Sequence, residues 1–230
     1  MKLNKIIATT LPAMLLAYLA ISITWPKSDL TPNAQANQDQ GFVSLFNGKD
    51  FTGWDQRGGK AQYTIKNNQI IGKTVKNTPN SFLTTEKHYD NFILELEYKV
   101  DPKLNSGIQI RSNSDPAHRN GQVHGYQIEI DPSPRAWSAG IYEEARRGWL
   151  FKLDKNKPAQ KAFKQNQWNH YKIKCQGNRI QTWINGVPAA DFTETNPIGY
   201  KTGFIGLQVH RHKKAGLKIA WRNIKIKELK

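Results

Sequence analysis

The residues best suited to chemistry lie in a short segment of alternating apolar and polar side chains, Tyr126–Asp131. Side chains of a β-strand alternate between two faces, so Gln127, Glu129 and Asp131 share one face. The apolar side chains on the opposite face predict a core behind the strand. A row of two carboxylates and an amide is typical of surfaces that bind sugars or transfer protons, and an ordinary solvent-facing surface is the alternative.

Two other segments repeat this alternation and extend the predicted polar surface. In each of them an amide and a cationic or titratable side chain lie opposite an apolar face. If the three strands are neighbours in one sheet, we expect a ligand cleft. Its floor would contain Gln109, Arg111, Gln127, Glu129, Asp131, Gln208 and His210.

Glu129 is the best candidate for a general base or acid, because it lies in the middle of its strand between amides. Asp131 follows at about 6–7 Å between Cα atoms, a separation compatible with paired glycosidase carboxylates. Arg111, expected beside Glu129, could hold a carbonyl or hydroxyl oxygen or form an ion pair with it. His210 could transfer protons near neutral pH.

The remaining candidates are expected to bind substrate. Tyr142 and Glu143 follow the loop after the central strand and could complete the pocket. Trp137 and Trp149 could stack on a sugar ring, although a place in the core is equally compatible. The full predicted substrate-binding set is Gln109, Gln127, Tyr142, Glu143, Gln208, Trp137 and Trp149.

No metal ligand is assigned from the sequence. Glu129, Asp131 and Asp115 suit an oxygen-preferring divalent cation such as calcium, but the sequence contains no Asp-rich calcium loop. The histidines lack zinc-site spacing. Cys175 is the only cysteine, so no internal disulfide forms, and its alternation with apolar neighbours predicts a buried side chain.

The elements that position these residues are predicted to be short strands. After residue 40 there is no helix-period run of 12 or more residues, and 91–100 alternates clearly. Asn185-Gly186 predicts a hairpin. A change of alternation within 217–229 predicts a bulge near Arg222-Asn223. Residues 149–165 are expected to be a loop with one short strand, and two antiparallel sheets packed face to face are the predicted all-β architecture.

The N-terminal residues 1–36 are predicted to be a signal peptide or an uncleaved signal anchor, because Lys2 and Lys5 precede a long apolar run. Residues 37–40 are read as a linker and 41–229 as the domain. The domain is therefore expected to be periplasmic or secreted, with membrane attachment only if the segment is retained.

The chain carries a formal net charge of +16. Such a charge favours anionic partners, for example an acidic polysaccharide, a membrane surface or nucleic acid, and a solvated basic surface is the alternative. No helix-turn-helix, zinc-finger or RNA-recognition motif accompanies the charge, so nucleic acid is not an expected partner.

Six blocks, in order along the chain, together resemble the 3-keto-disaccharide hydrolase domain family. They are GFVSLFNGKDFTGW at 41–54, NSGIQIR at 105–111, the long block at 125–150, the block at 167–192, GFIGLQVH at 203–210 and WRNIKIKEL at 221–229. The resemblance implies a concanavalin A-like jelly-roll sandwich. It also implies action on glycosides oxidised at C3, by removal of the C2 proton, elimination at C1 and hydration.

For this reaction we expect Glu129 to be the base and Arg111 to polarise the ketone. His210 is the expected acid for the leaving oxygen. One difference stands out, because many family members resemble Glu-x-Gln where this chain has Gln127-x-Glu129. The leading interpretation is an exported enzyme that cleaves 3-keto-glycosides. The alternatives are a non-catalytic carbohydrate-binding module of the same fold and a protein that binds anionic polymers or surfaces.

Overall fold

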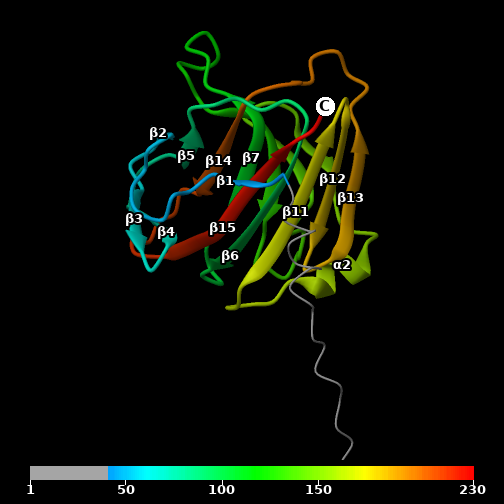
Figure 1. The fold of residues 1–230 in the computed structure, drawn as a ribbon. Coiled ribbons are helices and arrows are strands. Elements are labelled where there is room, and N and C mark those ends of the chain that lie inside the picture. Colours follow the sequence, from blue (N-terminus) through cyan, green and yellow to red (C-terminus); the bar gives the residue numbers. More distant parts are fainter. Residues whose placement is uncertain (1–40) are drawn as a thin grey trace, which may run out of the picture. The chain divides into compact units, whose positions relative to one another are not determined.

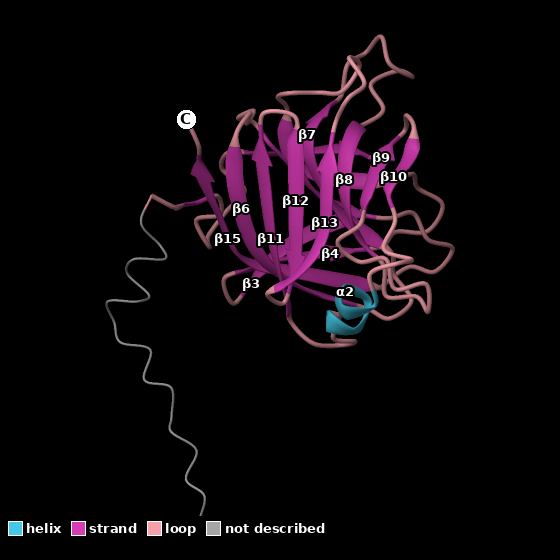
Figure 2. Cartoon of the chain, turned by 90° about the vertical axis from the view of Figure 1, so that its right-hand side faces the viewer, coloured by secondary structure: helices cyan, strands magenta, loops and turns pink. Residues whose placement is uncertain are grey.

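The computed structural model describes residues 41–230, which form two antiparallel β-sheets packed face to face (Figures 1 and 2). The predicted all-β sandwich is therefore confirmed. The signal segment predicted at 1–36 and the linker predicted at 37–40 lie outside the described residues.

One sheet, called the back sheet, has the order β13-β12-β11-β6-β15-β4-β3, and β1 also pairs with β15. Alternation is clearest in its central strand, whose inward residues from Phe92 to Val100 are buried. The strands of the back sheet are β1 (Val43–Ser44), β3 (Gln62–Lys66), β4 (Gln69–Lys73), β6 (Phe92–Val100), β11 (Asn169–Gln176), β12 (Arg179–Ile184), β13 (Val187–Thr193) and β15 (Lys218–Glu228).

The other sheet, called the cleft sheet, has the order β10-β9-β8-β7-β14-β5-β2. Its strands are β2 (Trp54–Gly58), β5 (Ser81–Thr85), β7 (Ser106–Asn113), β8 (His124–Ile130), β9 (Ile141–Glu144), β10 (Gly148–Phe151) and β14 (Phe204–Val209). The strands that carry the predicted polar surface, β7, β8 and β14, are neighbours in this order, as the sequence predicted.

The apolar core lies between the two sheets, and a few hydroxyl groups cross it. Tyr171 of β11 donates a hydrogen bond of 2.6 Å to the backbone carbonyl of Glu129. Tyr63 of β3 donates one of 2.9 Å to the carbonyl of Leu207 in β14. Both bonds reach the cleft sheet from its core side. They hold the backbone of strands whose polar side chains lie on the other side of that sheet.

Two local predictions are confirmed. The register of β15 shifts between Arg222 and Lys225, where Asn223 adopts a left-handed φ of 52°. This bulge lets the inward side chains change parity along one strand. Cys175 is fully buried, and burial raises the pKa of its thiol to about 12.

The segment expected to be a loop contains a short helix, α2 (Lys157–Ala162), so this part of the prediction was wrong. Pro158 lies in the first turn, where a backbone N–H has no partner within the helix. The Asn156 side chain accepts a hydrogen bond of 3.1 Å from the N–H of Ala159 and caps the helix. Six residues are too few to give a periodic signal. The strand expected near Leu150 is present as β10.

Within residues 41–230 no helix has both the length and the apolar character needed to span a membrane.

Candidate functional site

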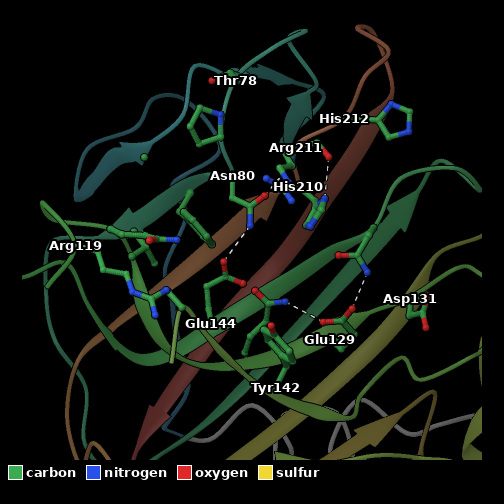
Figure 3. Close-up of a pocket in the computed structure, with 18 of the residues that line it drawn as sticks. Thr78, Asn80, Arg119, Glu129, Asp131, Tyr142, Glu144, His210, Arg211 and His212 are labelled. Atoms are coloured by element: carbon green, nitrogen blue, oxygen red, sulfur yellow. Dashed lines mark hydrogen bonds between the residues drawn. The ribbon is translucent and has the colours of Figure 1, made fainter. Parts of the chain in front are cut away.

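The outward face of the cleft sheet bounds a cleft of about 1850 Å³ (Figure 3). Its floor includes Gln127 and Glu129 from β8 and Tyr142 and Glu144 from β9. Loops that follow β4, β7, β8 and β14 form its walls. Figure 3 shows Glu129 and Glu144 entering this space from neighbouring strands.

Three glutamines from three strands form one hydrogen-bonded chain, and Gln127 is the member that lines the cleft. The side-chain oxygen of Gln127 accepts hydrogen bonds from the amides of Gln109, at 2.6 Å, and Gln208, at 2.8 Å. The Gln127 amide in turn donates to Glu129 Oε2 at 2.9 Å. The predicted grouping of Gln109, Gln127, Glu129 and Gln208 on one face is therefore confirmed. Gln109 and Gln208 are nevertheless fully buried and absent from the cleft lining, so the expectation that they form its floor was wrong.

Glu129 is a buried carboxylate, with 4% of the residue exposed. Its Oε1 accepts a hydrogen bond of 2.6 Å from Asn105 and lies 3.6 Å from the Arg135 guanidinium. Burial raises the pKa of Glu129 to about 7, and the neighbouring Asp131 adds to the rise. The hydrogen bonds from Asn105 and Gln127 and the charge of Arg135 oppose it. A carboxyl group of this pKa can exchange a proton at neutral pH.

Arg111 does not lie beside Glu129, and the expectation that it shares a face with Gln109 was wrong. Arg111 has a left-handed φ of 44°, and the pairing of β7 with β8 shifts register between Ile110 and Asn113. This bulge reverses the alternation after Ile110. Ser112 therefore lies on the same face as Gln109, and its hydroxyl donates to the side-chain oxygen of Gln109 at 2.8 Å.

The guanidinium of Arg111 is instead part of the protein interior, with 1% of the residue exposed. It donates hydrogen bonds to the backbone carbonyls of Asp90, at 2.8 Å, and Gly177, at 2.7 Å. It also donates to the side-chain oxygen of Asn91 at 3.2 Å. Arg111 thus joins the chain near β6 to the turn between β11 and β12 and is absent from the cleft lining.

Of the two residues of β9 expected in the pocket, Tyr142 lines the cleft and Glu143 does not, and sugar binding by Tyr142 stays a prediction. Ile141 faces the core, so Glu143 shares its face and Tyr142 shares the cleft face with Glu144. Glu143 is fully buried and forms ion pairs with Arg146, at 2.8 Å, and with Arg147. Sequence analysis missed Glu144, although the same parity rule, started at Ile141, would have found it.

Glu144 is a further buried carboxylate that lines the cleft. It accepts hydrogen bonds from Asn80, at 3.0 Å, and from Gln208, at 3.5 Å. Burial raises its pKa, while these two bonds and the charge of Arg211 lower it. Through Gln208 and Gln127 the hydrogen-bonded chain joins Glu144 to Glu129. Asn80 and Asn105 come from loops, where no sequence period marks a site residue.

Asp131 lines the cleft as predicted, but its carboxylate organises the following loop. It accepts hydrogen bonds from Arg135 Nε, at 2.7 Å, and from the backbone N–H groups of Ser133 and Trp137. The Arg135 side chain is thereby held beside Glu129. Any part of Asp131 in a reaction stays a prediction.

Of the remaining predicted residues, Trp149 and His210 line the cleft and Trp137 lies behind Trp149. Trp149 lines the cleft, and Trp137 packs edge-on against it at 4.8 Å between ring centroids. The Arg135 guanidinium lies over both rings, at 4.8 and 5.0 Å. His210 lines the cleft after the end of β14, and burial lowers the pKa of its ring.

Residues 41–230 contain no cluster of three or more His, Cys, Asp and Glu side chains suited to a metal. The carboxylates of Glu129 and Asp131, considered for calcium, are hydrogen bonded to Asn105, Gln127 and Arg135. A cation would have to compete with these donors.

Because Gly107 has no side chain, the side chain of Gln127 can lie against its backbone. A side chain at position 107 should therefore displace Gln127 and change the pKa of Glu129. A Cβ atom at position 107 would lie 2.5 Å from Gln127 Cγ and Cδ. We expect Gly107→Ala to displace Gln127 and break its bond to Glu129. Because that bond lowers the pKa of Glu129, the pKa should rise above about 7. Carboxyl ¹³C NMR titration measures the shift, and an unchanged titration in a folded variant would refute the coupling.

Comparisons with known proteins agree with this architecture. A family model described as a 3-keto-alpha-glucoside-1,2-lyase-like domain matches residues 41–227. A candidate glycosyl hydrolase from Parabacteroides distasonis ATCC 8503 has a TM-score of 0.62 at 22% identity, over 87% of this chain and 98% of its own. The search of curated proteins gives no match.

Two further structures share the fold. The carbohydrate-binding module CBM66 from Bacillus subtilis has a TM-score of 0.57 at 14% identity, over 81% of this chain and 100% of its own. A Bacillus subtilis protein with a galectin-like fold has a TM-score of 0.62 at 12% identity, over 81% and 94%. The family model spans most of the sequence, so the chain belongs to the 3-keto-alpha-glucoside-1,2-lyase-like domain family.

Proposed function

We propose that this protein cleaves glycosides whose sugar has been oxidised to a ketone at C3. The family and the fold neighbours support a carbohydrate-related function. The observation that carries the finer proposal is Glu129, a buried carboxyl group of pKa about 7 on the floor of a large cleft. Removal of a proton next to a ketone needs such a base.

In the first step Glu129 takes the C2 proton, and the electron pair of the broken C2–H bond moves into an enolate at C3. Arg135 is the cation beside Glu129, at 3.6 Å, and it stabilises the negative charge that develops on the ketone oxygen. It takes the role that the sequence suggested for Arg111. Its guanidinium can do so while its Nε holds Asp131.

In the second step the enolate re-forms the ketone, a C1=C2 double bond forms and the C1–O bond breaks. The leaving oxygen needs a proton, and Glu144 supplies it because burial raises its pKa. His210 also lines the cleft, but burial lowers the pKa of its ring and favours the neutral form, so it is less suited than Glu144 to donate this proton. Release of the unsaturated ketone is a lyase reaction, and addition of water across C1=C2 completes hydrolysis.

The test is incubation of the protein with a panel of 3-keto-glycosides and with the same glycosides before oxidation. We expect cleavage of the ketones alone, followed by mass spectrometry, and incorporation of deuterium at C2 in D₂O. Parallel samples with added calcium and with chelator examine a cation requirement. Ketones that stay intact and exchange no C2 proton would contradict the proposal.

A second candidate is a carbohydrate-binding module without catalysis. Tyr142 and Trp149 line the cleft and present aromatic surface to a bound sugar, and a carbohydrate-binding module shares the fold. On this hypothesis sugar binding is lost in Trp149→Ala, while 3-keto-glycosides stay intact throughout a long incubation.

The pH dependence of cleavage should report the ionisation of Glu129. The base is active when it is deprotonated, so kcat/KM is expected to fall as the pH drops through about 7. Asn105→Ala removes a bond that lowers this pKa, so the acidic limb should move to higher pH. A pH–rate profile of the wild type and of Asn105→Ala measures the shift. If the acidic limbs of the two profiles coincide, the ionisation that they report does not belong to Glu129.

We also propose that the protein is exported, in periplasmic or secreted form, on the basis of the N-terminal residues 1–36. Cell fractionation, with the mass of the mature protein, distinguishes a cleaved signal from a retained anchor.

A further inference from the structure

Three cationic side chains lie at the mouth of the cleft. Arg211 and Lys213 follow the end of β14, and Arg119 lies in the loop between β7 and β8. All three are exposed and line the cleft. We call this group the cationic rim. It brings together residues about 90 positions apart in the sequence, which composition and charge alone could not place at one site.

The cationic rim forms no direct ion pair with an acid among the described residues. In the part of the chain that the structure describes, no ion pair or side-chain hydrogen bond joins Arg119, Arg211 or Lys213 to an acid. Other arginines are differently placed, since Arg135 pairs with Asp131. Further paired examples are Arg146 and Arg147 with Glu143, Arg179 with Asp191 and Arg222 with Glu97.

The acids of the cleft lie deeper than the rim. Glu129 and Glu144 are buried on the floor, and the Asp131 carboxylate is occupied by Arg135. Apart from the charge interaction of Arg211 with the buried Glu144, the mouth presents to an entering ligand positive charge that no acid of residues 41–230 pairs with. The net charge of +16 on the chain adds a long-range attraction for anions.

One side of the rim is fixed to the floor by two hydrogen bonds. The backbone N–H of Arg211 donates to Asn80 Oδ1 at 2.9 Å, and Asn80 Nδ2 donates to Glu144 Oε1 at 3.0 Å. Figure 3 shows Arg211, Asn80 and Glu144 in this succession. A ligand group bound by Arg211 would thus lie toward Glu144, whereas Arg135 and Trp149 flank the site near Glu129.

We propose that the sugar substrate carries an anionic group, a carboxylate or a sulfate ester, which Arg211 and Lys213 bind at the Glu144 side of the cleft. The inference rests on the proposed function, because it takes the cleft as a sugar site. A guanidinium binds either anion through paired N–H groups, and a lysine adds a flexible charge. Neutral sugars would leave both cations unused.

The test is calorimetric binding of three unoxidised ligands to the full-length protein: phenyl glucoside, phenyl glucuronide and phenyl glucoside 6-sulfate. We expect at least one anionic ligand to bind about tenfold more tightly than the neutral one, as one charge-assisted contact provides. The double variant Arg211→Gln/Lys213→Gln should lose this preference. The control Lys99→Gln/Lys103→Gln removes two exposed charges outside the cleft lining and should retain it.

The two anionic arms identify the group, since a preference for the glucuronide indicates a carboxylate and one for the sulfate indicates a sulfate ester. Equal affinity for all three ligands, no binding of any, or a preference that survives in Arg211→Gln/Lys213→Gln would overturn the inference. The result is separable from catalysis. An anionic preference without cleavage of any 3-keto-glycoside contradicts only the proposed reaction, and cleavage without the preference contradicts only the inference.

Discussion

Glu129→Gln is expected to lower kcat/KM for a 3-keto-glycoside by about 10³-fold, within the range found when a general base is removed. Glutamine has the same shape and can still accept a hydrogen bond from Asn105, but it cannot take the C2 proton. Its NH2 group replaces the oxygen that accepts from Gln127, so that one bond is lost. Exchange of the C2 proton with D₂O should disappear with cleavage. Calorimetry should show that the variant still binds the sugar, because Tyr142, Glu144 and Trp149 still line the cleft.

The matched control is Glu86→Gln, which removes an exposed carboxylate that does not line the cleft. It should retain full activity. If Glu129→Gln retained cleavage and exchange, Glu129 would not be the base. Glu144, a further buried carboxylate that lines the cleft, would then be tested by the same substitution.

Arg111→Ala is expected to destabilise the protein by about 3 kcal/mol, since it removes charge-assisted hydrogen bonds to two backbone carbonyls and one side chain. For a domain of this size the melting temperature should fall by about 6–12 °C. At a temperature where the variant is folded, KM should match that of the wild type, because Arg111 is absent from the cleft lining.

Arg179→Ala is the control for Arg111→Ala. Arg179 also bonds through two guanidinium nitrogens, but its partner Asp191 and the ion pair are exposed. Its removal should change the melting temperature much less. Differential scanning calorimetry gives both values. If the Arg111→Ala protein melted at the wild-type temperature but had lost activity, Arg111 would take part in the reaction. That result would contradict the conclusion that Arg111 only stabilises the fold.

Alternation along single strands was enough to predict much of this protein. It placed Gln127 and Glu129 on one face, and the same rule on two other strands supplied Gln109 and Gln208. Those strands proved to be neighbours. The rule works because each strand packs one face on the core, so a side chain's face follows from its position.

The failures have physical causes of two kinds. At Arg111 a left-handed residue inserts a bulge, and nothing in the alternating residues before it indicates where parity reverses. Glu143 was expected in the pocket from its nearness to the preceding loop, but alternation from the core-facing Ile141 places it on the buried face. Asn80 and Asn105 come from loops, whose side-chain directions depend on tertiary contacts and have no period.

The direction of the hydrogen bonds around Glu129 has a stereochemical consequence. Gln127 turns its oxygen toward two amides and so offers only its N–H to Glu129. Asn105 likewise donates to the other carboxylate oxygen. A proton taken by Glu129 would find no acceptor among these partners and would have to return through the open cleft. If Glu129 is the base, the hydrated product should be reprotonated at C2 on the face that lost the proton, with retained configuration.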